Sequence, residues 1–90
     1  MPPPKPWVLQ IEPDVVKAMA RIPKDVAKRI FDEMHRLPTD PFAGDVQKLK
    51  GRENVWRRRI GSYRIFYKLF TKERVILVFH VERRTSTTYD

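Results

Sequence analysis

The 90-residue chain carries 19 Lys and Arg residues against 11 Asp and Glu, which gives a formal net charge of +8, and it contains no cysteine. This length fits one domain with a single modest core, and the lack of cysteine excludes disulfides and thiolate chemistry. No apolar run approaches the roughly 20 residues that a membrane-spanning helix needs, so we expect a soluble, cytoplasmic protein without a membrane partner.

The first half of the chain predicts one strand and two helices. Residues 1–6 (MPPPKP) are expected to form an extended proline-rich tail, because proline fits neither helix nor sheet. Residues 7–11 resemble a short strand, and Pro13 suits the first turn of a short helix that ends near Pro23. From residue 24 to residue 37 apolar side chains recur with the helical period, which predicts a second helix that covers a sheet.

The second half predicts a hairpin and a further strand. Residues 38–46 are rich in turn-forming residues and are expected to connect helix to sheet. Residues 55–70 alternate aromatic, β-branched and basic side chains around Gly61-Ser62, which is typical of two strands joined by a tight turn. Residues 74–81 are apolar on both faces, which predicts an interior strand. The order βααβββ predicts a single α+β domain over residues 1–90, with the N-terminal strand and helical hairpin packed on a mainly antiparallel, twisted sheet.

The positive charge is concentrated in the predicted sheet. Residues 46–90 hold 12 basic and four acidic residues, whereas residues 1–45 hold seven of each. Strand alternation places Arg57 and Arg59 on one face, and a hairpin register could bring Arg64 near them. Three neighbouring guanidinium groups repel one another, so the arrangement predicts a polyanionic partner, of which nucleic acid is the commonest kind. Arg58 falls on the face that should be apolar, and it fits there only if its stem packs and its head reaches an edge.

Several other chemistries lack the residues they need. With two histidines, no cysteine and no carboxylates at ligand spacing, we expect no metal site and no cofactor. The three glycines are isolated, so no glycine-rich phosphate loop is predicted. The remaining candidates are basic residues of the second half and a tyrosine near its end: Lys48, Lys50, Arg57, Arg59, Arg64, Arg83, Arg84 and Tyr89.

Several short motifs follow one another in an order typical of one protein family. They are Lys48-Leu49-Lys50-Gly51, Trp56, Arg59-Ile60-Gly61-Ser62-Tyr63-Arg64, Tyr67, and Arg83-Arg84 with Tyr89. In these motifs, and in its length and predicted element order, the chain resembles the RelE/ParE-type toxins of bacterial and archaeal toxin–antitoxin pairs. The closing Arg83, Arg84 and Tyr89 resemble the RelE-like branch of this family.

The resemblance implies a ribosome-dependent mRNA endonuclease (an mRNA interferase) that cuts in the ribosomal A site without a metal. In this reaction the ribose 2′-hydroxyl attacks its own 3′-phosphate and leaves a 2′,3′-cyclic phosphate and a 5′-hydroxyl. The implied partners are the ribosome and mRNA, a cognate antitoxin that shields the basic surface, and operator DNA bound only through the toxin–antitoxin complex.

Matching positions imply roles for individual residues. Arg59 and Arg64 would stabilise the charge of the transition state, with Arg57 on the same strand face. Arg83 would lie near the leaving 5′-oxygen, and Tyr89 would stack on or orient the nucleotide that is cut. Four further residues would bind the RNA backbone: Lys48, Lys50, Arg52 and Arg84.

The chain departs from its relatives where a proton acceptor is needed. Relatives often carry lysine at the positions of Arg57 and Arg59, and arginine does not give up its proton in proteins. Many relatives also have a histidine immediately before the Arg83 position, where this chain has Glu82. On a regular strand His80 would share a face with Glu82, so either residue is a candidate acceptor.

Three alternatives remain open at the level of sequence. A ParE-like inhibitor of DNA gyrase would share the hairpin motifs but needs no catalytic arginine and tyrosine at its end. A non-catalytic RNA-binding module would bind nucleic acid in a salt-sensitive way without cleaving it. The arginines could also form a solvated basic face without chemistry.

Overall fold

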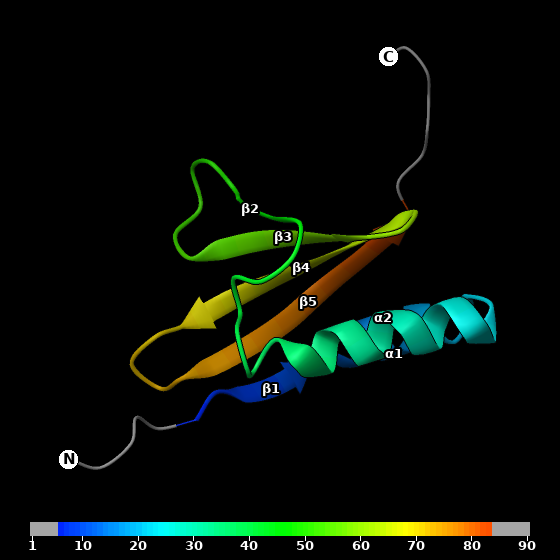
Figure 1. The fold of residues 1–90 in the computed structure, drawn as a ribbon, viewed down its shortest axis with the longest axis horizontal. Coiled ribbons are helices and arrows are strands. Elements are labelled where there is room, and N and C mark those ends of the chain that lie inside the picture. Colours follow the sequence, from blue (N-terminus) through cyan, green and yellow to red (C-terminus); the bar gives the residue numbers. More distant parts are fainter. Residues whose placement is uncertain (1–5, 84–90) are drawn as a thin grey trace.

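The computed structural model describes residues 6–83 (Figure 1). In chain order the elements are β1 (Val8–Ile11), α1 (Pro13–Met19), α2 (Lys24–Arg36), β2 (Val46–Lys48), β3 (Val55–Ile60), β4 (Tyr63–Phe70) and β5 (Val75–Arg83). The strands form one sheet in the order β1-β5-β4-β3-β2, in which β1 is parallel to β5 and the other neighbours are antiparallel. The predicted α+β class is therefore confirmed, and so is the interior position of the last strand.

The sheet contains one strand that the sequence did not predict. β2 begins at Val46, the last residue of the turn-rich connection, and pairs with Trp56 to Arg58 of β3. Three residues are too few to show an alternating pattern, so only the pairing with β3 identifies this edge strand. Neither helix in the described part of the chain is long and apolar enough to cross a membrane.

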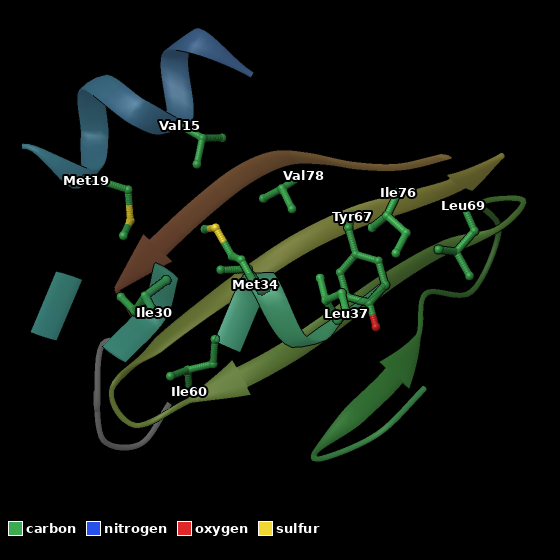
Figure 2. Packing of buried hydrophobic residues seen from close by; sticks show 11 residues of the cluster. Val15, Met19, Ile30, Met34, Leu37, Ile60, Tyr67, Leu69, Ile76 and Val78 are labelled. Carbon is green, nitrogen blue, oxygen red and sulfur yellow. The ribbon is translucent and has the colours of Figure 1, made fainter. Parts of the chain in front are cut away.

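Both helices pack on one face of the sheet (Figure 1). Pro13 opens α1, where its missing N–H costs no hydrogen bond, and Pro23 immediately precedes α2. The apolar side of α2 contributes Ile30 and Met34 to the core, and Leu37, which caps its C-terminus, joins them; Figure 2 shows all three among side chains of β4 and β5. The helical period predicted from residue 24 onward thus faces the sheet as expected.

A β-bulge interrupts the pairing of β4 with β5. Phe66 pairs with His80 but the next residue, Tyr67, pairs with Val78, so Phe79 is an extra residue in β5. Val78 is buried against the helices, and uninterrupted alternation would have turned His80 and Glu82 to that side. The bulge instead directs His80 and Glu82 to the face opposite the helices, which we call the open face.

Arg58 lies on the helix-covered face, as alternation predicts, and is only 8% exposed. Its guanidinium forms an ion pair with Glu33 of α2. Gly44 lies over the same guanidinium, because a Cβ built on Gly44 would come within 2.7 Å of Arg58 Nη2. The charged head thus reaches a carboxylate at the helix–sheet boundary, which explains how the residue fits at this position.

Candidate functional site

The open face carries a basic pocket formed by β2, β3 and β4. This arginine pocket encloses about 200 Å³ and is lined by Asp45, Gln47, Arg57, Arg59 and Arg64. The register places Arg59 directly opposite Arg64, and Gln47 opposite Arg57. The prediction that the three arginines meet on one face is therefore confirmed.

The three guanidinium groups have different surroundings. Arg57 donates a hydrogen bond to the side-chain oxygen of Gln47, and Arg64 Nη1 lies 3.8 Å from Glu82 Oε2. Arg59 is exposed, and among residues 6–83 its side chain has no ion pair or hydrogen-bond partner. Asp45 is the only acidic residue that lines this pocket in the described part of the chain. The pocket is therefore net positive and suits an anion such as a phosphate group.

The two candidate proton acceptors lie together beside this pocket. His80 Nε2 is 3.2 Å from Glu82 Oε1, and the second oxygen of the same carboxylate faces Arg64. Both residues lie on the open face, which confirms that they share a face. Neither lines the arginine pocket itself, and Glu82 is the nearer through its contact with Arg64.

A second pocket adjoins the first on the open face. This aromatic pocket is a shallow, open depression with a volume of about 530 Å³, lined by Leu49, Arg52, Phe66, Phe79, His80 and Glu82. The Phe66 ring centroid lies 5.3 Å from that of His80 and 6.5 Å from that of Phe79. Sequence reasoning missed this group, because Phe66 and Phe79 are ordinary strand residues until the bulge at Phe79 is known.

Arg83 does not line the arginine pocket. It pairs with Tyr63, on the side of the sheet that carries the helices, and lines a separate cavity of about 450 Å³ with Arg29 and Gly61 among others. The reason is again the bulge, because uninterrupted alternation from Val78 would have turned residue 83 to the open face. The structure thus does not bring Arg83 together with the other three arginines, and its catalytic role stays a prediction.

The predicted RNA-binding residues are spread along one edge. Lys48, Lys50 and Arg52 are exposed, at the end of β2 and in the loop that follows it. Of these three, only Arg52 lines a pocket of the open face. Arg84 and Tyr89 lie outside the described residues. Among residues 6–83, no three His, Asp or Glu side chains form a metal-binding group.

Comparison with known proteins shows which family the chain resembles in sequence and fold. Residues 9–87 match the family model described as the ParE toxin of the type II toxin–antitoxin system parDE. The chain is 29% identical over 79 residues to RelE1 of Methanocaldococcus jannaschii, a toxin by name, with 84% of this chain and 88% of that protein covered.

Solved structures share the fold. A chain of the archaeal RelE–RelB complex from Pyrococcus horikoshii OT3 superposes with a TM-score of 0.81 at 28% identity, over 92% of this chain and all of that one. The isolated RelE toxin of E. coli superposes with a TM-score of 0.77 at 16% identity, over 90% and 87% of the two chains. With a matching family model over most of its length, the chain belongs to the RelE/ParE-type toxins of type II toxin–antitoxin systems.

Proposed function

We propose that this toxin is a RelE-like, ribosome-dependent mRNA endonuclease that cleaves by attack of a ribose 2′-hydroxyl, without a metal. The observation that carries the proposal is the arginine pocket, in which three guanidinium groups and one carboxylate line a space of about 200 Å³. A second candidate, the ParE-like gyrase inhibitor, is favoured by the description of the matching family and by the position of Arg83 outside this pocket.

Cleavage by a 2′-hydroxyl requires positive charge around the phosphate that is attacked. When the 2′-oxygen bonds to phosphorus, negative charge grows on the non-bridging oxygens, and the bond to the 5′-oxygen breaks. The 5′-oxygen takes up a proton from solvent and leaves as a hydroxyl. Donors fixed around those oxygens stabilise the transition state more than the ground state. Arg59 and Arg64 face each other across the hairpin and are our candidates for this role, with Arg57 held beside them by Gln47.

A proton acceptor is needed for the 2′-hydroxyl, and arginine does not act as one. Glu82 is our candidate, because its carboxylate lies beside Arg64 and contacts His80. The proton would pass from the 2′-oxygen to Glu82, and His80 could receive it in turn. Glu82→Gln should then slow cleavage while leaving RNA binding in place, since glutamine keeps the shape of the side chain but not its basicity.

A cognate antitoxin is the proposed protein partner. The P. horikoshii relative was solved as a RelE–RelB complex, and the net charge of +8 of this chain favours an acidic or amphipathic antitoxin segment over the basic face. We propose that operator DNA is bound only through the complex with the antitoxin.

The test is primer extension on an mRNA translated in a purified system, with and without the protein. We expect cuts at codon spacing that require the ribosome, and Arg59→Ala should reduce them about 100-fold, as the loss of one transition-state donor does. Lys72→Ala is the matched control, since it removes an exposed positive charge in the β4–β5 turn, away from the pocket. An intact message together with trapped gyrase–DNA complexes would establish the ParE-like alternative, and salt-sensitive RNA binding without cuts would establish a binding module.

The C-terminal residues need a separate test. We expect Arg83→Ala and Tyr89→Phe each to abolish toxicity while the fold is kept, as the family positions imply. Arg84→Ala belongs in the same series, because the adjacent arginine could take the catalytic position instead. Full toxicity of the Arg83→Ala/Tyr89→Phe double variant would remove both residues from the site.

A further inference from the structure

We infer that the aromatic pocket is a nucleobase subsite, which takes one unstacked base next to the phosphate held in the arginine pocket. This inference rests on the proposed function for the identity of its ligand, RNA. Nothing in the roles implied for this family required Phe66 or Phe79.

The two pockets lie side by side on the open face, although no residue lines both of them. Phe66 of the aromatic pocket is the register partner of Arg57, and Glu82 of the aromatic pocket is the partner of Arg64. Glu82 also contacts Arg64 at 3.8 Å, so the wall of one pocket touches the wall of the other. An RNA strand whose phosphate lies among the arginines therefore has a neighbouring base over β4 and β5.

The lining of the aromatic pocket suits a base. Phe66 and Phe79 are only partly buried, and their rings meet at 45°, so an aromatic surface is left exposed for stacking. Unpaired RNA bases bind proteins by stacking on such rings and by hydrogen bonds along their edges. Arg52 at the same pocket supplies a hydrogen-bond donor for those edges. A volume of about 530 Å³ leaves ample room for a purine.

The bulge at Phe79 creates this pocket. The extra residue places His80 opposite Phe66 and directs Glu82 to the open face, where both line the pocket. Bulges often redirect side chains beside functional sites. An apolar side chain of a protein partner could fill the same space, but the adjoining pocket of three guanidinium groups favours a nucleotide, whose base is joined to a phosphate.

The test measures binding of a short RNA with a 2′-deoxy residue at the cut position, which prevents cleavage. Its dissociation constant is compared with those of otherwise identical oligonucleotides that lack one base at each position in turn. We expect one position at which removal of the base weakens binding roughly tenfold. Phe66→Leu should abolish that difference, because leucine keeps apolar bulk but offers no ring face, whereas Phe66→Tyr should retain it.

Phe70→Leu is the matched control. Phe70 lies on the same strand and the same face as Phe66 but at the other end of β4, outside the aromatic pocket. We expect this variant to behave as the unsubstituted protein. Equal binding of intact and abasic oligonucleotides at every position, or a base effect that survives Phe66→Leu, would overturn the inference. The inference would also be overturned if Phe66→Leu weakened binding of the antitoxin but left binding of RNA unchanged.

The outcomes separate this inference from the proposed function. If the protein cleaves mRNA but shows no base-dependent binding, the nuclease stands and the subsite fails. If it never cleaves but discriminates against one abasic position through Phe66, the subsite stands and the nuclease proposal fails.

Discussion

Arg58 shows how a single charged residue is accommodated on an apolar face. Its guanidinium is paired with Glu33, whose other oxygen lies 3.6 Å from Arg36, and one nitrogen, Nη1, is buried without a hydrogen-bond partner. Buried ion pairs often add little net stability, but removing one partner leaves the other charge uncompensated. Removing Arg58 should therefore destabilise the fold mainly because the Glu33 carboxylate loses its partner, and less because the ion pair itself is stabilising.

We predict that Arg58→Met lowers the free energy of unfolding by about 2–3 kcal/mol, toward the low end for broken buried pairs because Glu33 retains Arg36. Urea unfolding measures this cost. The Arg58→Met/Glu33→Leu double variant should recover most of it, since no lone buried charge remains. If Arg58→Met were as stable as the unsubstituted protein, the Arg58–Glu33 ion pair would not contribute to stability.

The buried side chain of Tyr67 contacts the connection between α2 and β2. Its hydroxyl donates a 2.5 Å hydrogen bond to the carbonyl oxygen of Pro41, and burial raises its pKa from 10.0 to about 12. Because the pKa is higher in the folded protein, the stability that this shift contributes is complete below pH 10 and is lost as the pH rises through 12.

We predict that the free energy of unfolding of Tyr67→Phe falls less between pH 10 and pH 12 than that of the unsubstituted protein, because phenylalanine does not ionise. At neutral pH the variant should be about 1 kcal/mol less stable, because the carbonyl of Pro41 loses its donor. The free energy of unfolding of both proteins, measured from pH 8 to pH 12, checks the prediction. Curves that stay parallel over this range would contradict it.

At the scale of elements, the connection between α2 and β2 is held in place by its contact with the buried Arg58 side chain. Gly44 has a φ of +87°, a conformation that favours glycine, and it has no room for a side chain above the Arg58 guanidinium. Gly51, in the loop after β2, has a similar φ of +76° but nothing within 4 Å of its missing Cβ. The two glycines therefore share a backbone conformation in which any other residue would be strained, and they differ in packing.

We predict that Gly51→Ala costs about 1 kcal/mol from backbone strain alone, and that Gly44→Ala costs at least twice as much. Thermal or urea unfolding of the two variants gives the comparison. The excess should shrink when Gly44→Ala is combined with Arg58→Met, whose flexible side chain can move aside. A Gly44→Ala variant no worse than Gly51→Ala would mean that Arg58 is not held beneath this loop.

At the scale of the whole molecule, the net charge of +8 predicts that binding of nucleic acid weakens as salt increases. Each single-stranded phosphate neutralised by the protein changes the slope of log affinity against log salt by about −0.7. We predict a strongly negative slope for binding of single-stranded RNA, made shallower by about 0.7 in Arg59→Ala. Anisotropy titrations between 50 mM and 200 mM salt provide the measurement, with Lys72→Ala as the matched variant whose slope should be unchanged.

The sequence alone determined those features that depend on neighbours along the chain. The period of residues 24–37 predicted a helix with one buried side, and Gly61-Ser62 predicted the hairpin that sets Arg59 opposite Arg64. The ordered motifs of the second half indicated the family. Each of these is encoded within one strand, one helix or one tight turn, where a local period or turn preference is enough.

Only the tertiary structure decided how separate elements meet. β2 exists because three residues find a partner in β3, and Arg58 is accommodated because Glu33 of α2 lies beside it. The bulge at Phe79 reverses the alternation of β5, so that His80 and Glu82 join the arginines while Arg83 leaves them. A bulge forms where one strand has an extra residue relative to the strand it pairs with. The alternation of residues along a single strand does not show how that strand is aligned with its partner, so the sequence pattern could not predict the bulge.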